Sequence, residues 1–409
     1  MSASSDRYLR HDLIDWFSQT EVKAARIAVV GAGAIGNEVV KNLALLGVGQ
    51  IDVYDFDTVE IHNLTRSVLL RESDLGRPKA ACVVERAAEL DPNCRLRAMT
   101  GDVRDTLNPG SISMYSAVIS AVDNFDARLR LNQLCLLASV DFINAAIDSR
   151  FVSLETFPHS RWDIACYECH LPDSTYQRIA ERYSCGGLMK RAFEERKVPT
   201  TAITASLAGA MAAAAALGLG DPANKSPGAR RVFLDSHTML SQASSLMRQS
   251  ACPACSGLRS RPKRIELADL RLILKDNEAG RSTAVFQEHG SDDSEATFSE
   301  DSILVVLPEP VITGYRCAQC GGNQGQGLGA SDVIGHRARQ FDDRLSWCPN
   351  CKAASMQIEL RERFGLAELE QLSAQMAMPH PPAAFAIAHY HDQSGYIEWN
   401  CEQVDHASS

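Results

Sequence analysis

The sequence predicts an α/β protein built on a largely parallel sheet with helices on both faces, together with zinc-stapled segments further along the chain. Three observations carry this prediction. An apolar, β-branched run enters a glycine-rich turn at residues 26–36, strand and helix patterns then alternate as far as residue 147, and four Cys-x-x-Cys pairs follow. Strands that alternate with helices are typical of parallel sheets, because parallel neighbours need long crossover connections.

The first elements form one strand–helix–strand unit. Residues 26–36 are predicted to be a strand that runs into the glycine turn, residues 37–49 follow at helical spacing and end on glycines, and residues 50–57 are the next strand. The next predicted element is a helix at residues 78–90, with proline in its first turn. A buried strand that ends in an acid follows at residues 114–123, then a helix at 125–140 and a strand at 141–147.

The composition indicates a globular protein that binds neither membranes nor nucleic acid. Of the 409 residues, 45% are hydrophobic and 22% charged, and the net charge is −10. An acidic protein without a basic run repels phosphate backbones. Residues 198–220 form an uncharged run long enough to span a bilayer. Because this run is mostly Ala, Thr, Ser and Gly, we expect a buried helix in the core or at a subunit interface instead.

The chain is expected to divide into four parts. Residues 1–25 are an amphipathic helical lead-in, residues 26–256 the main α/β domain, residues 257–306 a linker with an acidic, turn-rich loop, and residues 307–409 an accessory domain. In the accessory domain, residues 356–377 follow a helical pattern, whereas residues 384–399 alternate like two strands around a turn.

Cysteine spacing predicts two structural zinc sites. The polar, charged N-terminal residues do not resemble a signal peptide, so we expect a reducing cytoplasmic environment in which paired thiols bind metal. Two Cys-x-x-Cys knuckles supply four thiolates to one zinc ion. Because no position on the metal is left open for a substrate or water, such a zinc site is structural and not catalytic. The first set is Cys166, Cys169, Cys252 and Cys255. The second, typical of a zinc ribbon, is Cys317, Cys320, Cys348 and Cys351. The region of the second set is either a stapled accessory fold or a docking module for a carrier protein or a conjugating enzyme.

The glycine turn predicts a Rossmann-like nucleotide site. Gly31, Gly33 and Gly36 form a G-x-G-x-x-G pattern, in which the first glycine makes the tight turn, the second lets backbone approach phosphate, and the third lets helix pack on strand. The N-terminus of the following helix favours anions. Asp55, at the end of the second strand, has the position of an acid that binds ribose hydroxyls.

The charged residues beyond the second strand favour a triphosphate over a dinucleotide. Arg66 and Lys79 are candidate cations for the phosphates, and Asp123, at the end of a later strand, is a candidate Mg²⁺ ligand. Solvated surface charges are the alternative for each residue. For the protein as a whole, the alternatives are a nicotinamide-dependent oxidoreductase and a non-catalytic scaffold.

Several motifs in register resemble the ubiquitin-activating-enzyme-like superfamily, which includes the ThiF-type and molybdopterin-synthase adenylyltransferases of bacteria. These motifs are RYLRHD, the glycine pattern, DFDTVEIHNLTRS, DLGRPKA, SAVDNFDARLRLN and the first two cysteine knuckles, over about residues 7 to 255. The resemblance implies ATP-dependent adenylation of the C-terminal carboxylate of a ubiquitin-like or sulfur-carrier protein ending in Gly-Gly. An enzyme that modifies a ribosomal peptide is an alternative within the superfamily.

The resemblance also implies residue roles. Asp55 would bind ribose, Asn63, Arg66 and Lys79 the triphosphate, and Asp123 the magnesium, with Asp57 and Asn124 as further nucleotide contacts. Arg10 would reach into the ATP site of the partner subunit of a homodimer. The lone Cys185, with Arg182 and Lys190 close in sequence and two glycines following, would lie on a loop crossing the adenylate site. Nearby cations favour its thiolate, so it is either the nucleophile that accepts the acyl group or a loop thiol without a covalent role.

Overall fold

The computed structural model describes residues 7–172, 174–175, 199–218, 228–258, 260–264, 303–317, 319–320, 348, 351–352, 356–365, 385–390 and 393–398. The chain divides into two compact units. One comprises Met1–His170 and Val198–Gly257, and the other comprises Leu171–Lys197 and Leu258–Ser409. Each unit has a sheet of its own.

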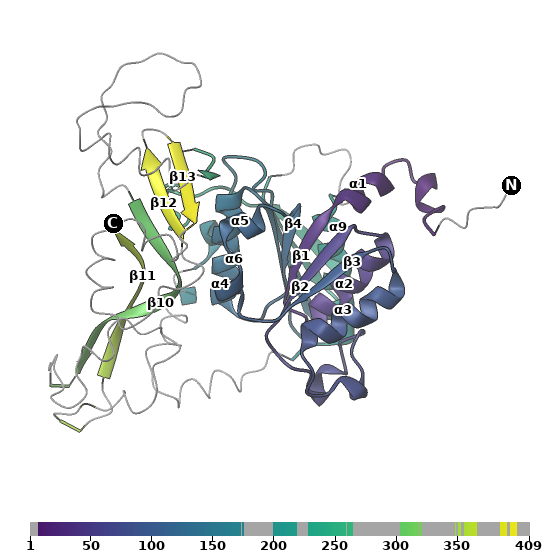
Figure 1. The fold of residues 1–409 in the computed structure, drawn as a ribbon, viewed down its shortest axis with the longest axis horizontal. Helices are drawn as coiled ribbons and strands as arrows, with labels where there is room; N and C mark the ends of the chain where they lie inside the picture. The colour runs from purple at the N-terminus through teal and green to yellow at the C-terminus, as the bar shows by residue number, and fades with distance from the viewer. Residues whose placement is uncertain are drawn as a thin grey trace, which may run out of the picture. The chain divides into compact units, whose positions relative to one another are not determined.

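The sheet of the first unit has eight strands in the order β3-β2-β1-β4-β5-β6-β7-β8 (Figure 1). Its strands are β1 (Arg26–Val30), β2 (Gln50–Tyr54), β3 (Arg95–Met99), β4 (Ala117–Ser120), β5 (Asp141–Ile147), β6 (Phe151–Phe157), β7 (Arg230–Asp235) and β8 (Leu240–Ser245). The first five in this order pair in parallel, and β6, β7 and β8 add antiparallel pairings. The predicted α/β class with a largely parallel sheet is therefore confirmed.

Helices cover both faces of this sheet, as predicted (Figure 1). One face packs against α2 (Ala34–Leu46), α3 (Lys79–Leu90) and α9 (Ala202–Ala216), which enclose the main hydrophobic core with Ile27, Val29 and their neighbours. On the other face lie α4 (Val103–Thr106), α5 (Pro109–Ile112) and α6 (Phe125–Ala138). The strands β2 and β4 are buried along their whole length. Strand β4 accordingly reads as a short apolar run, whereas β2 buries Gln50 and Asp52 among its apolar residues.

The lead-in at the N-terminus consists of a 3₁₀ turn, η1 (His11–Leu13), and the short helix α1 (Gln19–Ala24). Tyr8 anchors it, because its ring is buried and its hydroxyl donates to the carboxylate of Asp91. The Gln19 amide also donates to the Leu46 carbonyl oxygen at the end of α2, over 2.9 Å.

The uncharged run at residues 198–220 contains α9, and this helix packs against α2 as well as the sheet. Gly209 permits the contact, because a Cβ atom at that position would lie 2.3 Å from the Cβ atom of Glu38. Ala205, Ala208 and Ala212 are fully buried. The prediction of a buried helix is confirmed. Within the described ranges, no helix combines the length and hydropathy needed to cross a bilayer.

Two predicted boundaries differ from the structure. Helix α2 begins at Ala34 rather than at residue 37, because Gly33 is its N-cap and the last glycine of the pattern already lies inside the helix. Strand β4 ends at Ser120, so that Asp123 lies three residues beyond the strand, in the turn before α6.

The second unit holds a five-stranded sheet in the order β11-β10-β12-β13-β9. Its strands are β9 (Lys263–Arg264), β10 (Ile303–Cys317), β11 (Met356–Gly365), β12 (Phe385–Tyr390) and β13 (Gln393–Glu398). The predicted strand pair at 384–399 is confirmed as the antiparallel pair β12–β13. Part of the predicted linker at 257–306 contributes to this sheet, since β9 pairs with β13 and β10 begins at Ile303.

The helix predicted for residues 356–377 is wrong over residues 356–365, where the chain forms β11. The segment MQIELRERF alternates between apolar and polar side chains over its first half, which suits a strand with one buried face. Pairing with the long strand β10 decides between the two patterns, because the ladder runs from Met356 to Gly365 with register shifts and satisfies backbone groups on one side of β11. The remainder, 366–377, lies outside the described residues.

A buried carboxylate joins β2, β3 and the turn before β4. Asp52 is fully buried, its Oδ1 accepts from Arg97 Nε over 2.8 Å, and its Oδ2 accepts from the Tyr115 hydroxyl over 2.7 Å. Burial acts to raise the pKa of Asp52, but the hydrogen bonds from Arg97, Tyr115 and Gln50 outweigh it and hold the pKa below its ordinary value. The ionised carboxylate therefore stabilises the fold.

We expect Asp52→Asn to lower the free energy of unfolding by about 2 kcal/mol at pH 7, the usual scale for hydrogen bonds to a charged group. Because the folded pKa is depressed, the stabilisation is complete above the unfolded value of about 3.9 and is lost as the pH falls through the folded value. Urea unfolding between pH 7 and pH 2 measures this. The difference in unfolding free energy between the wild type and Asp52→Asn should close toward pH 2. Asp15→Asn, at an exposed carboxylate, should have the same unfolding free energy as the wild type at every pH.

Candidate active site

The strand order reverses between β1 and β4, and such a switch point is where open α/β sheets bind ligands. The chain leaves β1 toward α2 and β2 on one side, while β4 leads to α6 and β5 on the other. Gly31 closes the turn after β1 with φ of 98°, in the left-handed region. A Cβ atom there would lie 2.6 Å from the Ala121 carbonyl oxygen, so only glycine fits between the two strand ends.

The other two glycines of the pattern serve different purposes. At Gly36 a Cβ atom would lie 1.8 Å from the carbonyl oxygen of Gly31, so this glycine lets α2 pack on its own turn. At Gly33, apart from its chain neighbours and the backbone of α2, no atom of the described residues lies within 4 Å of an added Cβ, and its φ of −76° is open to any residue. Gly33 therefore leaves space in front of the N-terminus of α2, where phosphate is favoured by free N–H groups and the helix dipole.

These contacts predict opposite outcomes for two Gly→Ala substitutions. We expect Gly33→Ala to fold with an unchanged melting temperature but to bind ATP at least 10-fold more weakly, because its methyl group occupies the space for phosphate. Gly36→Ala should lower the melting temperature strongly, because its methyl group overlaps backbone. Thermal unfolding and calorimetric ATP titration check both variants. Unchanged ATP affinity in Gly33→Ala would exclude this turn as the phosphate site.

Asn37, which the sequence analysis did not single out, ties the glycine turn to the segment that carries Arg66. Its side chain is fully buried. The amide nitrogen donates to the Ala32 and Gly33 carbonyl oxygens over 2.7 and 3.0 Å, and Oδ1 accepts from the Leu69 N–H over 2.9 Å. A buried side-chain amide needs hydrogen-bond partners, and here the glycine turn and the Leu69 segment supply them.

Asp55 and Asp57 follow β2 and border the same turn. The Asp55 carboxylate accepts from the Ala32 N–H over 2.6 Å and from the Asp57 N–H over 2.7 Å, while burial raises its pKa. The Asp57 carboxylate instead forms an ion pair with Lys79 over 2.8 Å. The Lys79 side chain is only 12% exposed. The structure thus brings the candidate ribose ligand and one candidate cation to the same edge of the sheet, with the cation held by Asp57.

The segment between β2 and α3 carries the remaining candidate phosphate ligands. Asn63 is buried and its Oδ1 accepts from the Glu60 N–H over 2.9 Å, which shapes the turn η2 (Ile61–Asn63). Arg66 is half-buried and donates from Nη1 to the His62 carbonyl oxygen over 2.7 Å. Among the described residues, no carboxylate pairs with Arg66.

Asp123 and Asn124 form the turn between β4 and α6. Asp123 is exposed, and within the described ranges the structure records no ion pair to its carboxylate. The Asn124 side chain caps α6, because its Oδ1 accepts from the Ala127 N–H over 2.9 Å. This cap fixes the start of the helix. Asp123 follows the carboxyl end of β4, and the two residues before it, Ala121 and Val122, lie against Gly31.

The other two candidates are not joined to this group by the structure. Arg10 is exposed in the lead-in before η1. Cys185 lies outside the described residues, as do Arg182 and Lys190.

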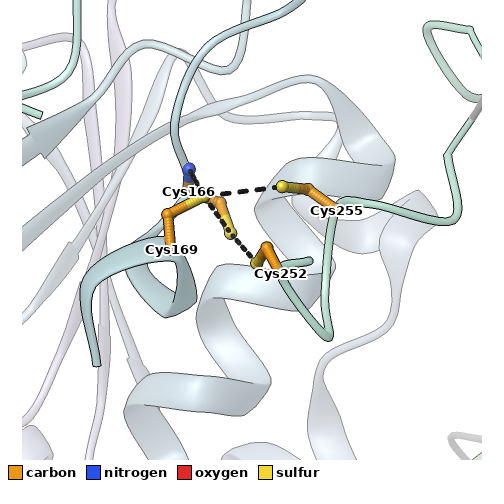
Figure 2. A group of neighbouring side chains, drawn as sticks. All are labelled: Cys166, Cys169, Cys252 and Cys255. Atoms are coloured by element: carbon orange, nitrogen blue, oxygen red, sulfur yellow. Dashed lines mark hydrogen bonds between the residues drawn. The ribbon is translucent and has the colours of Figure 1, made fainter. Parts of the chain in front are cut away.

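The first two cysteine knuckles meet in space, as Figure 2 shows. The four sulfur atoms of Cys166, Cys169, Cys252 and Cys255 lie within 4.8 Å of one another. The Cys166–Cys252, Cys169–Cys255 and Cys166–Cys169 sulfur pairs are 3.6, 3.5 and 3.9 Å apart. A tetrahedron with Zn–S bonds of about 2.3 Å has edges of about 3.8 Å, so this geometry fits zinc and excludes disulfides.

The second set of cysteines forms a similar cluster in the second unit. The sulfur atoms of Cys317, Cys320, Cys348 and Cys351 also lie within 4.8 Å of one another. The Cys317–Cys351 and Cys320–Cys348 sulfur distances are 3.6 and 3.7 Å. Two of the thiols are buried and two exposed, as expected for a small site near the surface. Both predicted ligand sets are therefore able to hold a tetrahedral metal.

The glycine turn at a strand reversal, with charged groups around it and a four-thiol cluster in the same unit, defines a class of nucleotide-binding α/β proteins with a metal-binding cluster. The model of the ThiF family matches residues 6–255, and the chain belongs to this family.

Curated relatives carry names from the same group. The chain is 32% identical over 150 residues to SUMO-activating enzyme subunit 2 of Dictyostelium discoideum, covering 36% of this chain and 22% of that protein. It is 31% identical over 166 residues to molybdopterin-synthase adenylyltransferase of Salmonella typhimurium, covering 40% and 66%. The sulfur carrier protein ThiS adenylyltransferase of Escherichia coli is 25% identical over 266 residues, covering 63% and 97%. The chain thus spans two thirds or less of the length of the first two relatives.

Among solved structures, the chain resembles E. coli MccB in fold. The MccB structure with ATP has a TM-score of 0.50 and 21% identity, covering 62% of this chain and 75% of MccB. This likeness supports the α/β architecture of the first unit.

Proposed function

We propose that the protein catalyses ATP-dependent adenylation of the C-terminal carboxylate of a ubiquitin-like or sulfur-carrier protein that ends in Gly-Gly. The observation that carries this proposal is the turn at the β1/β4 reversal, where Gly33 leaves space in front of α2 and the Asp55 carboxylate accepts from the Ala32 N–H of the same turn. Lys79 pairs with Asp57, two residues beyond Asp55, and Asp123 follows β4. Membership of the ThiF family supports it, as do the relatives named as adenylyltransferases and activating enzymes.

Each candidate residue has a role in this proposal. Asp55 binds the ribose hydroxyls, with its carboxylate already oriented by two backbone N–H groups. Arg66, Lys79 and Asn63 bind the triphosphate, and a charge-assisted contact of this kind contributes about 1.5–3 kcal/mol. Asp57 holds Lys79 in place over 2.8 Å. Asn124 caps the N-terminus of α6 with its side chain and also contacts the nucleotide.

The reaction needs positioning and charge neutralisation rather than a protein nucleophile. A carboxylate oxygen of the carrier attacks the α-phosphorus of ATP, the bond to the β-phosphate oxygen breaks, and pyrophosphate leaves with the electron pair. The product is an acyl-adenylate. Negative charges on both reactants repel each other, so the cationic side chains and the N-terminus of α2 lower the barrier.

Asp123 is the proposed ligand of Mg²⁺. An exposed carboxylate at the carboxyl end of β4, without an ion-pair partner in the described part of the chain, fits an ion that keeps most of its water and phosphate ligands. When bound, Mg²⁺ neutralises phosphate charge and supports departure of pyrophosphate.

The proposal extends to the assembly and its surroundings. Arg10 is proposed to complete the ATP site of a partner subunit in a homodimer, which its exposure permits. Each four-thiol cluster is proposed to hold one structural zinc, and the protein to act in the cytoplasm. The second unit is proposed to dock a carrier protein or a conjugating enzyme.

ATP–pyrophosphate exchange tests the reaction. With ATP, Mg²⁺ and a small Gly-Gly-ending carrier encoded beside this protein, labelled pyrophosphate should enter ATP. The same carrier with its C-terminal carboxylate amidated is the matched control and should give no exchange. Absence of exchange with every such carrier would contradict the proposal. ATP binding without turnover would then indicate a non-catalytic scaffold. A change in NADH absorbance with candidate substrates would indicate an oxidoreductase.

Cys185 is proposed to accept the acyl group as a thioester. We expect Cys185→Ala to retain pyrophosphate exchange within about twofold, because adenylation does not use the thiol, and to lose any thioester-linked carrier. Non-reducing electrophoresis with a labelled carrier, with and without thiol treatment, measures this. A thioester that persists in Cys185→Ala would refute the role.

A further inference from the structure

The two four-thiol clusters differ in how well the chain covers them. In the first cluster three of the four cysteines are buried and the fourth, Cys169, is half-buried. In the second cluster Cys317 and Cys348 are buried, whereas Cys320 and Cys351 are exposed. Each knuckle of the second cluster therefore has one covered cysteine and one that solvent reaches.

Side chains from outside the knuckles hold the first cluster closed. Asn132, in the middle of α6, accepts at Oδ1 from the Tyr167 N–H over 3.0 Å. Its amide nitrogen donates to Glu168 Oε1 over 3.2 Å, and Tyr167 and Glu168 are the two residues between the thiols of the first knuckle. At the other knuckle, Arg248 donates from Nη2 to the Cys255 carbonyl oxygen over 2.8 Å. Both knuckles of the first cluster are thus attached to the rest of the first unit.

The second cluster lies at one end of the long antiparallel pair β10–β11. Cys317 is the last residue of β10, and its register partner is Met356, the first residue of β11. Cys351 shortly precedes Met356 in the chain. The opposite end of the pair is formed by Leu304 and Gly365. Metal in the second cluster would therefore tie the two strands together at the Cys317 end.

Exposure decides which of these thiols react with an oxidant. A thiol that binds zinc is deprotonated, so the ligands are nucleophiles, and those that a reagent reaches react first. Hydroperoxides convert accessible thiolates to sulfenic acids, which condense with a second thiolate to a disulfide. A covered sulfur lies close to each exposed one, because Cys320 and Cys348 are 3.7 Å apart and Cys351 and Cys317 are 3.6 Å apart.

We propose that the second cluster is a site of oxidation by hydroperoxides, at which Cys320 or Cys351 reacts first and zinc is released. The exposed thiolate attacks one oxygen of hydrogen peroxide, the O–O bond breaks, and hydroxide leaves. A neighbouring thiolate then attacks the sulfenic sulfur, forms the disulfide and expels a second hydroxide. The two thiolates lose two electrons, and the peroxide gains them. The two thiolates that remain hold zinc too weakly to keep it. The presence of zinc in this cluster rests on the proposed function, whereas the order of thiol reactivity does not.

Zinc release from the full chain tests the proposal. With zinc in both clusters, hydrogen peroxide should release one equivalent about 10-fold faster than the other, as measured with a colorimetric chelator. Peptide mapping after the first equivalent should find a disulfide that includes Cys320 or Cys351. Dithiothreitol and added zinc should reverse the change. Release of both ions at one rate, first oxidation of the Cys166 knuckle, or a second cluster that never holds zinc would overturn the proposal.

Brief labelling with N-ethylmaleimide measures access to the thiols without an oxidant. In the zinc-loaded protein, Cys320 and Cys351 should be labelled about 10-fold faster than Cys317 and Cys348. Cys94 is the control, because it is buried and lies outside both clusters, and it should stay unlabelled. Equal labelling of the four ligands would overturn the assignment of the exposed pair.

Arg248→Ala tests whether cover separates the two clusters. Without the guanidinium that holds Cys255, release of the first zinc by peroxide should become about threefold faster, while release of the second stays unchanged. Arg95→Ala, at an exposed arginine on the edge strand β3, is the matched control and should behave as the wild type. Wild-type release of the first zinc in Arg248→Ala would contradict protection by cover.

Hydrogen exchange measures the consequence for the fold. Oxidation should speed amide exchange about 10-fold at residues 315–317 and 356–358, next to the cluster, and leave residues 304–306 and 363–365 unchanged. Unchanged exchange next to the cluster would contradict the link between the metal and the strand pair. If no carrier supports pyrophosphate exchange, the proposed adenylation fails, and zinc release still decides the oxidation site.

Discussion

Asp123→Asn is expected to lower carrier-dependent pyrophosphate exchange about a thousandfold. Losing the single carboxylate that the proposal assigns to Mg²⁺ removes stabilisation of the developing charge on the phosphates, on the order of 4 kcal/mol. The exposed position of Asp123 means that the substitution removes no buried contact. The melting temperature should therefore stay within about 2 °C of the wild type, which separates a catalytic defect from a folding defect.

Asp126→Asn is the matched control for this result. Asp126 lies in the first turn of α6, three residues from Asp123, and pairs with Arg104 over 3.7 Å. Its substitution removes the same charge from the same turn region, and exchange should fall less than threefold. Equal losses in the two variants would mean that local charge, and not metal ligation by Asp123, governs the reaction. Rates measured over a range of Mg²⁺ concentrations distinguish the two.

Cys166→Ala is expected to remove one zinc per chain and to destabilise the first unit by more than about 5 kcal/mol. Zinc sites of this type contribute about 10–16 kcal/mol in peptides, and the three remaining thiols hold the metal more weakly. Cys166 is fully buried, and its knuckle is tied to α6 through Asn132, so the loss should spread to that helix. Metal analysis of the purified protein and urea unfolding measure the two effects.

Cys94→Ala serves as the control, because Cys94 is a buried cysteine outside both clusters. It should keep both zinc ions and lose no more than about 1–2 kcal/mol, the range for removing a small buried side chain. A Cys166→Ala protein that retains full zinc content and stability would show that the first cluster binds no structural metal.

The glycine pattern and the cysteine spacing allowed much of the site to be predicted from residues close together in sequence. Gly36 is required by the Gly31 carbonyl oxygen within the same turn, and Gly31 needs a left-handed φ, so the pattern can be recognised without the fold; the contact of Gly31 with Ala121 cannot. The two residues between paired cysteines let both thiols face one ion, so each knuckle can also be recognised from the sequence. Pairing of the knuckles across the chain was inferred correctly because a tetrahedral metal needs four ligands.

Other features depended on partners distant in sequence. The strand β11 was mistaken for a helix, because pairing with β10, and not the local sequence pattern, determines the secondary structure of this segment. The antiparallel strands β6, β7 and β8 were not predicted, since exposed strands such as β8 give no apolar signal. Asn37 was missed as well, because a polar side chain in a helix reveals its role only through what it contacts.

The sequence by itself determined the α/β class, the glycine turn and the four Cys-x-x-Cys pairs, because each depends on short-range geometry that a few residue types impose. Only the tertiary structure decided that Lys79 is held by Asp57, that Asn37 ties the glycine turn to the Arg66 segment, and that Asn132 holds the first cysteine knuckle to α6. These contacts join residues far apart in the chain, and hydrogen bonds of that kind form where folding brings donor and acceptor together.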